Sequence, residues 1–299
     1  MNHHRLSRVE SASEAALVGQ PRRGVQASAE RSTRRRRHDR SDSRRDHRDA
    51  RLRRMTLAAA TVLTIVSTAT FFVLERVRPG RTLPNAPGWY GRALAINLCQ
   101  IGLTLAGNKV WNRAFANQPS LVHLSVLNAP LLEGFVGWLV GTFVFYWWHR
   151  LRHANGFWQV FHQVHHSPTR IEVLTSFYKH PVEIASNTVL SASILYGLLG
   201  VSLWGAYWFN FFAATAEYFY HANFRSPHWL RYFIQTPELH SIHHQLDVHN
   251  YNFSDLPLWD RLFGTYKDTT NFAPACGFPR GNERRLGRML VFQDVYNAA

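Results

Sequence analysis

Long apolar runs alternate with shorter polar segments along most of this chain, and the runs have the lengths of helices. The clearest run, residues 131–148 (LLEGFVGWLVGTFVFYWW), contains one charged residue, Glu133. Residues 56–74 form a second run, and residues 93–110 form a weaker third run that contains three side-chain amides. Because about 20 apolar residues cross a bilayer as a helix, each run predicts a membrane span.

A longer apolar stretch covers residues 182–220 and is interrupted by Gly200 and Gly205. Its length is sufficient for two crossings, so it predicts a helical hairpin that returns to the side it left. We therefore expect an all-α, polytopic membrane bundle of four or five spans. A histidine-rich cap, built partly from the segments after Arg150 and Phe224, should cover one end of this bundle.

Eight histidines fall in three short clusters beside the apolar runs. Within each cluster the spacing is i, i+3 or i+4, so a helix would present the imidazoles on one side, where they can converge on a metal. One tetrahedral zinc ion needs only about four protein donors, which predicts a two-metal site here. The clusters are HRLRH (His149, His153), HQVHH (His162, His165, His166) and HSIHH (His240, His243, His244).

The type of metal site also follows from the clusters. A carboxylate-bridged di-iron bundle would contain Glu-x-x-His pairs, and the clusters contain none, which favours a histidine-rich site. The alternative, a polar interfacial helix tuned for pH sensing, does not require two separate HxxHH triplets and one HxxxH pair. His123, His228 and His249 stand apart from the clusters, and we expect structural or surface roles for them.

The first 54 residues differ in composition from the rest of the chain. They hold sixteen arginines, no lysine and seven acidic residues, so they carry +9 of the formal net charge of +15. With almost no apolar periodicity, this segment is predicted to be a disordered, solvated tail. A basic tail can tether a protein to anionic lipid, whereas nucleic-acid binding is not expected, because the segment lacks aromatic residues that stack on bases.

Counting spans places the histidine clusters across the membrane from the N-terminus. A cytoplasmic metal site would then require export of the sixteen arginines, against the tendency of positive charge to stay inside. Translation from Met55 would remove this conflict. We therefore hypothesise that residues 1–54 are absent from the working protein, and that the metal site faces the cytoplasm.

The predicted organisation has four parts. A tail covers residues 1–54, N-terminal membrane spans residues 55–130, the catalytic region residues 131–266, and a C-terminal tail residues 267–299. The two cysteines of the chain provide neither a disulfide framework nor a metal motif.

Residues 131–266 resemble the fatty acid hydroxylase or sterol desaturase superfamily of integral-membrane, non-haem di-iron oxygenases. The resemblance rests on five motifs in a fixed order. They are HRLRH, HQVHHSPTRIEVLTSFYKHPVE, FYHANF, TPELHSIHH and NYNFSDLPLWDRLFGTY.

The resemblance implies iron ligands among these motifs: His149, His153, His162, His165, His166, His240, His243 and His244, with His221 of FYHANF as a ninth. Glu217, four residues before His221, would be either a carboxylate ligand or an acceptor that orients an imidazole. His180 matches a recurrent family position. The chain departs from the family at Lys179, where arginine is common, and at Asn252-Phe253, where the pattern usually runs to glycine.

The resemblance also implies the chemistry. Two ferrous ions held by neutral imidazoles can use O2 to take hydrogen from an unactivated C–H bond, giving an alcohol or, after a second abstraction, an alkene. A dry cleft beside the bilayer suits a lipid such as a sterol, fatty acyl chain or alkylglycerol. Electrons would come from a separate ferredoxin or cytochrome with its reductase, docking near basic residues on the metal side: Arg150, Arg152, Lys179, Arg231 and Arg261.

Three other classes remain as alternatives. A membrane zinc hydrolase would use three or four protein ligands, which leaves about half of the histidines unexplained. A bis-histidine haem protein needs two facing axial histidines and does not require HxxHH triplets. A metal carrier or transporter would line a path through the bilayer with its ligands, whereas these histidines gather at the ends of spans.

Overall fold

The computed structural model describes residues 55, 57–115, 118–154 and 156–296. The expectations for residues 1–54 lie outside these ranges. In the described ranges every regular element is helical, and the extended pairings are two isolated bridges, Pro79 with Phe224 and Gln245 with Cys276. The prediction of an all-α fold is confirmed.

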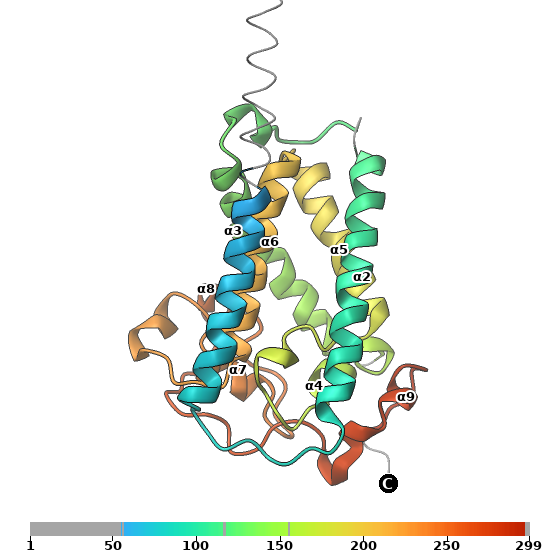
Figure 1. Ribbon diagram of the computed structural model, residues 1–299, viewed down its shortest axis with the longest axis vertical. Helices are drawn as coiled ribbons and strands as arrows, with labels where there is room; N and C mark the ends of the chain where they lie inside the picture. The colour runs from blue at the N-terminus through green and yellow to red at the C-terminus, as the bar shows by residue number, and fades with distance from the viewer. Residues whose placement is uncertain (1–54, 56, 116–117, 155, 297–299) are drawn as a thin grey trace, which may run out of the picture. The chain divides into compact units, whose positions relative to one another are not determined.

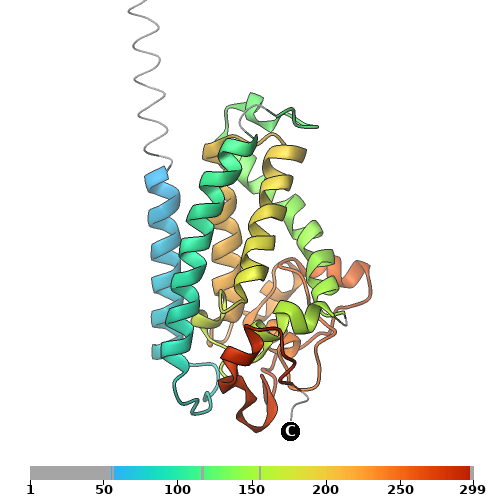
Figure 2. The same ribbon diagram turned by 90° about the vertical axis from the view of Figure 1, so that its right-hand side faces the viewer.

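The long helices run side by side and alternate in direction (Figures 1 and 2). Helix α3 packs against α6, and α2 packs against α5. The bundle consists of the helix Leu57–Val77, α2 (Trp89–Phe115), α3 (Pro130–Arg152), α5 (Pro181–Ala192), which continues into the π-helical segment η4 (Ser193–Leu198), and α6 (Leu203–His221).

Each apolar run of the sequence is helical in the structure. Two of the described helices, Leu57–Val77 and Pro130–Arg152, are long and apolar enough to cross a membrane. The side of α2 that faces away from the bundle exposes Leu94, Leu98 and Leu105, each more than half exposed. An extensive apolar surface of this kind is typical of contact with lipid, which supports a location in the membrane.

Small residues bring α3 and α6 into close contact. A Cβ atom on Gly134 would lie 2.4 Å from Cβ of Trp208, and a Cβ atom on Gly205 would lie 2.8 Å from Cβ of Glu133. Glu133, the one charge within its apolar run, accepts a hydrogen bond of 2.8 Å from the backbone N–H of Ser202, just before α6 begins. This buried carboxylate therefore joins the two helices at the end opposite the cap.

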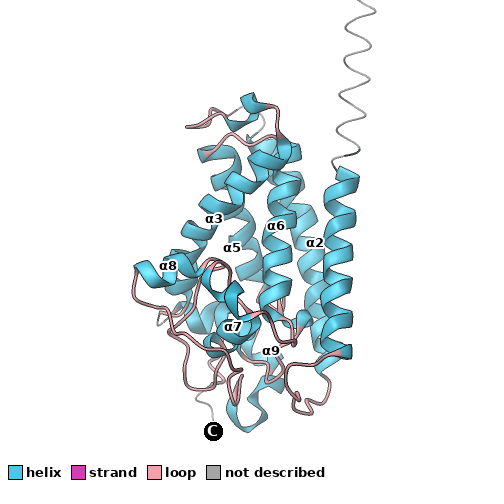
Figure 3. Cartoon of the chain, turned by 90° about the vertical axis from the view of Figure 1, so that its left-hand side faces the viewer, coloured by secondary structure: helices cyan, strands magenta, loops and turns pink. Residues whose placement is uncertain are grey.

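Short helices and loops form the cap at the other end of the bundle (Figure 3). Proline occupies the first turn of α5, α7 (Pro237–His243) and α8 (Pro257–Leu262), where its fixed φ suits a helix start and its missing N–H costs no hydrogen bond. Thr236 caps α7 by accepting a hydrogen bond from the N–H of Leu239. The start of α7 therefore sets the position of the helix that carries the third histidine cluster.

The segment from residue 267 to residue 296 is folded onto the cap, although its sequence suggested a tail. Phe278, Met289 and Val295 belong to a buried apolar cluster that also includes Trp89 and Val164. Gln163, between the first two histidines of HQVHH, donates a hydrogen bond of 2.8 Å to the backbone oxygen of Gln293. The C-terminal segment thus supports the helix that carries this cluster.

Candidate metal centre

Nine imidazoles from four parts of the chain meet at the cap end of the bundle. His149 lies in the last turn of α3 and His153 caps that helix, while His221 ends α6. The HQVHH cluster occupies η2 (Trp158–His162) and α4 (Gln163–His166), and the HSIHH cluster occupies α7 and its C-cap. The expectation that the clusters are helical is confirmed.

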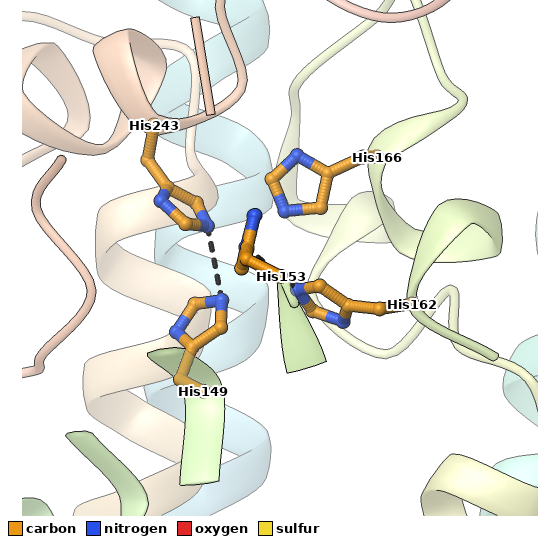
Figure 4. Close-up of side chains that lie close together, drawn as sticks. All are labelled: His149, His153, His162, His166 and His243. Atoms are coloured by element: carbon orange, nitrogen blue, oxygen red, sulfur yellow. Dashed lines mark hydrogen bonds between the residues drawn. The ribbon is translucent and has the colours of Figure 1, made fainter. Parts of the chain in front are cut away.

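The nine histidines form two separate groups. In each group one ring nitrogen per residue lies within 4.8 Å of those of the other members. Figure 4 shows the five rings of the first group pointing toward a common centre. We call the first group site A (His149, His153, His162, His166, His243) and the second group site B (His165, His221, His240, His244).

The HxxHH spacing divides each triplet between the two sites. Histidines at i and i+4 point to the same site, as His162 and His166 do at site A, whereas His165 points to site B. In the HSIHH triplet the i and i+4 residues belong to site B, and His243 belongs to site A. Successive residues of a helix lie about 100° apart around its axis. The two neighbouring histidines at the end of each triplet therefore face different sites, one site A and the other site B.

The two sites are adjacent. The ring of His166, from site A, stacks on the ring of His244, from site B, with centroids 4.3 Å apart and planes 19° apart. The centroids of His240 and His243, which also belong to different sites, are 5.1 Å apart. Two ions held by these groups would therefore lie next to each other and form one binuclear metal centre.

Hydrogen bonds to Nδ1 determine which ring nitrogens are available to a metal. Nδ1 of His149 lies 2.7 Å from the carbonyl oxygen of Phe253, and Nδ1 of His243 lies 2.8 Å from that of Tyr251. A carbonyl only accepts, so Nδ1 carries the proton in both rings and Nε2 of each neutral ring presents a lone pair. His221 has the same arrangement, since its Nδ1 donates to the carbonyl oxygen of Glu217 at 2.9 Å.

The Nε2 atoms face one another at distances that suit a shared cation. Nε2 of His149 lies 2.9 Å from Nε2 of His243, and Nε2 of His240 lies 3.1 Å from Nε2 of His221. In the first pair both atoms present lone pairs, so no proton of a neutral ring joins them. Metal–nitrogen bonds of about 2.1 Å at angles of 90–110° place ligand atoms roughly 3.0–3.4 Å apart, so the residues present fit metal ions.

The ligand set is kept neutral by its surroundings. Burial, followed by the proximity of other histidines, holds the pKa of His165, His166 and His244 well below the ordinary value of 6.5. Burial also lowers the pKa of His243 to about 3. Neutral imidazoles are the form that binds metal, so no proton has to be displaced from these rings at neutral pH.

Several buried nitrogens lack a hydrogen-bond partner. They include Nδ1 of His165, Nδ1 of His244 and both ring nitrogens of His166. Leaving polar atoms unsatisfied in a buried site costs free energy, which metal coordination would offset for the nitrogens that face site A or site B. This second observation agrees with the geometry.

A buried ion pair supports site A. Glu183, in α5, contacts both the guanidinium of Arg152 and Nδ1 of His162, the latter at 3.2 Å. Both side chains of the ion pair are buried. The carboxylate therefore fixes the orientation of the His162 ring and leaves its Nε2 toward His153, at 3.0 Å.

The loop after HSIHH supplies the acceptors for two ligands of site A. Asp260 accepts hydrogen bonds from the N–H groups of Phe253 and Ser254, at 2.8 and 3.0 Å. Asn252 adopts a left-handed conformation with φ of 55°. Glycine and asparagine favour this region, so an asparagine suits this position.

Glu217 and His180 lie outside both sites. The Glu217 carboxylate pairs with Lys179, and only its backbone carbonyl orients an imidazole, that of His221. His180 caps α5 by accepting a hydrogen bond of 3.1 Å from the N–H of Val182 to its Nδ1. Glu217 therefore orients a proposed ligand through its backbone and His180 supports α5, and neither side chain belongs to site A or site B.

The isolated histidines and the basic residues divide between surface and interior. His123 is exposed, whereas His249 is partly buried beside site A, with its ring centroid 5.2 Å from that of His166. Arg152 and Lys179 are buried in ion pairs, so the prediction that they receive an electron carrier was wrong for both. Arg150 remains exposed on the metal side.

Sequence reasoning did not identify the parts that orient the ligands. Asp260 and the carbonyl groups of Tyr251 and Phe253 were missed, because backbone acceptors leave no mark in residue types. The NYNFSDLPLWD motif was the available signal, since it contains all three residues. Glu183 stands in the quoted KHPVE motif, but its partner Arg152 could be identified only from the fold.

Comparison with known proteins gives a consistent result. The fatty acid hydroxylase family model matches residues 134–265. A very-long-chain aldehyde decarbonylase of Oryza sativa subsp. indica is 30% identical over 135 residues, which is 41% of this chain and 22% of the relative. No solved structure matches the chain.

Two further relatives cover similar portions. Fatty acid hydroxylase domain-containing protein 2 of Homo sapiens is 30% identical over 175 residues, 58% of this chain and 50% of the relative. Sphinganine C4-monooxygenase 1 of Arabidopsis thaliana is 30% identical over 126 residues, 40% of this chain and 48% of the relative. The matches thus span between about a fifth and a half of the length of these curated relatives.

Proposed function

Because this chain belongs to the fatty acid hydroxylase and sterol desaturase superfamily, we propose that it is a membrane-bound, O2-dependent di-iron enzyme acting on a lipid. It hydroxylates or desaturates a C–H bond of a sterol, fatty acyl chain, alkylglycerol or similar molecule. The observation that carries this proposal is the pair of adjacent all-histidine groups, sites A and B, each with enough donors for one ion.

The chain's own residues would hold and isolate the metal pair. Site A and site B would each bind one iron through Nε2 or Nδ1 of their histidines. When bound, the two ions supply the reductive activation of O2 that breaks an unactivated C–H bond. The carbonyl groups of Tyr251 and Phe253 and the carboxylate of Glu183 hold three of the rings in place, so the ligand atoms need little rearrangement on binding.

A cavity of about 90 Å³ adjoins the centre and would hold the reacting carbon. Histidines of both sites line it, namely His149, His165 and His240. Aromatic side chains, including Phe145 and Phe209, cover the side toward the bundle. The aromatic walls would help to exclude water from the reacting atoms, while polar lining residues such as Asn187 and Asp255 would also contact the ligand.

The enzyme would be a multi-pass protein with its cap in the cytoplasm. The long helices all begin or end at the cap, and two of them have the length and composition of membrane spans. Inserting one oxygen atom while reducing the other to water consumes two electrons, which a separate ferredoxin or cytochrome with its reductase would deliver. The exposed Arg150 and Arg261 provide positive charge for such an acidic carrier.

Lipid-dependent O2 consumption by the purified full chain, supplied with iron and a reducing partner, tests this function. We expect consumption in the unmodified protein and none after His165→Ala or His243→Ala, because each removes a ligand from one site. The exposed His123→Ala is the matched control and should retain activity. Full activity in His243→Ala, or bound zinc with hydrolysis of a lipid, would contradict the proposal and favour a membrane zinc hydrolase.

A further inference from the structure

Three adjoining cavities extend from the metal centre into the bundle. The second, about 150 Å³, lies between α2, α5 and α6, and a third of about 10 Å³ lies near the start of α6. The first and second share the lining residues Phe145, Lys179, Asn187 and Glu217. The second and third share Asn108, Tyr196, Ala206 and Asn210. A ligand in the second cavity would therefore adjoin the first cavity, which histidines of both sites line.

One wall of the second cavity is a polar stripe on α2. Gln100, Thr104 and Asn108 stand four residues apart and line the cavity together. Successive members are about 6 Å apart along the helix, so the stripe extends over roughly 12 Å. Asn210 of α6 lines the same cavity and adds an amide from a second helix.

The stripe leaves hydrogen-bonding capacity unused. The side-chain amide of Gln100 donates to the hydroxyl oxygen of Thr104 at 3.1 Å. The side-chain oxygen of Gln100 is buried and has no partner. Polar atoms inside a membrane bundle are costly when unsatisfied, and a hydrocarbon chain in this cavity would leave that oxygen unpaired. A hydroxyl group of a ligand could donate to it.

The charges beside the stripe are already neutralised. Lys179 and Glu217, which line both the first and the second cavity, form an ion pair with each other. Arg152, which lines the first cavity, pairs with Glu183. An ionised head group would have to displace one of these buried partners, which is unfavourable, so the walls suit a polar but uncharged group.

We propose that the second cavity binds the hydroxyl-bearing end of an uncharged lipid, whose hydrocarbon chain continues through the first cavity to the histidines. This assignment rests on the proposed function, because it makes the cavities one substrate site. It names the substrate class as neutral, hydroxylated lipids, in preference to alkanes and to ionised fatty acids.

Equilibrium binding of three radiolabelled probes with sixteen carbons tests the assignment. The probes are 1,2-hexadecanediol, hexadecanoate and hexadecane, applied to the full chain in nanodiscs and corrected for partition into protein-free nanodiscs. Without O2 or a reductant no turnover occurs. We expect the diol to bind roughly 25-fold more tightly than either other probe, since each of two hydrogen bonds contributes roughly fivefold in affinity.

Variants on the two sides of α2 separate the stripe from the helix as a whole. Gln100→Leu and Asn108→Leu should each weaken diol binding roughly fivefold and leave hexadecane binding unchanged, because a hydrogen bond is lost and apolar contact is kept. Leu98→Ala, on the opposite side of α2 and 59% exposed, is the control and should bind the diol normally.

Two results would overturn the assignment. One is equal binding of all three probes, or tightest binding of hexadecanoate, by the unmodified protein. The other is an equal loss for all probes in both stripe variants. Because no turnover is measured, failure of the O2 assay leaves this result unaffected, so the substrate class and the oxygenase reaction are tested separately.

Discussion

Nδ1 of His149 lies 2.7 Å from the carbonyl oxygen of Phe253, which joins the end of α3 to a loop 104 residues later in the chain. The loop itself is held by Asp260 and Asn252 rather than by a helix or a sheet. The orientation of a proposed metal ligand therefore depends on residues that never approach the metal.

Asp260→Asn should weaken metal binding at site A. The two carboxylate oxygens accept hydrogen bonds from the backbone N–H groups of Phe253, at 2.8 Å, and Ser254, at 3.0 Å. The side-chain amide of asparagine would place an NH₂ donor opposite one of these N–H donors, and that hydrogen bond would be lost. We expect a loss of about 1–3 kcal/mol in unfolding free energy and on the order of tenfold in metal affinity. Metal titration and denaturant unfolding measure both.

Asp268→Asn is the matched control for Asp260→Asn. Its carboxylate is 55% exposed and pairs with Arg231 on the surface. Such a change should alter stability by less than about 0.5 kcal/mol and leave metal affinity unchanged. Equal effects of the two substitutions would show that Asp260 has no special role.

Asn252 offers a test of backbone conformation. Its side chain donates to the carbonyl oxygens of Leu239 and Lys267 and accepts the N–H of Lys267, and both Asn252→Gly and Asn252→Ala remove these bonds. Alanine, unlike glycine, has a Cβ atom that makes the left-handed conformation with φ of 55° unfavourable. We therefore expect Asn252→Ala to be about 1 kcal/mol less stable than Asn252→Gly by denaturant unfolding. Alanine equal to or better than glycine would contradict this.

Because the histidines of each triplet are divided between site A and site B, substitutions of two adjacent histidines should change the Mössbauer spectrum in different ways. His243→Ala should perturb the iron at site A and His244→Ala the iron at site B, because the two residues belong to different groups. In Mössbauer spectra of protein loaded with ⁵⁷Fe, each variant should lose or alter a different component. Loss of the same component in both variants would mean that the two groups do not bind separate ions.

The metal-free protein should lose stability in acid. Burial lowers the pKa of His243 to about 3, against an ordinary value of 6.5 in the unfolded chain. Below pH 6.5 the unfolded state therefore binds more protons than the folded state. The stabilisation is fully present above pH 6.5 and falls progressively as the pH drops toward 3.

Thermal unfolding of chelated protein between pH 8 and pH 5 measures this dependence. The midpoint should change little from pH 8 to 6.5 and fall below that. His243→Gln removes one titrating group and should decline less steeply, while the exposed His123→Gln should follow the unmodified protein. A midpoint that rises on acidification would contradict the buried, neutral state of the histidines.

Much of the architecture could be predicted from local pattern. The apolar run at 131–148 and the stretch at 182–220 became α3 and the helices α5 and α6, since apolar segments of this length have few other stable forms in a membrane. Two metals were likewise predicted, because eight histidine donors are too many for one ion, and the structure gathers the histidines into two groups.

The division into sites could not be predicted in the same way. His165 and His166 are neighbours with the same side chain. Only the placement of α7 and of the end of α6 decides that one faces site B and the other site A. The same limit explains the errors at Arg152 and Lys179. Both are basic residues near the cap, but their acidic partners, Glu183 and Glu217, lie 31 and 38 residues away.

Metal content of the detergent-purified full chain, by elemental analysis with Mössbauer spectroscopy, is the most direct test of two histidine sites that hold iron. We predict two irons per chain, reduced toward one in His243→Ala and in His244→Ala. One zinc per chain without iron, in protein that also fails to take up ferrous iron after removal of the zinc, would contradict the di-iron proposal.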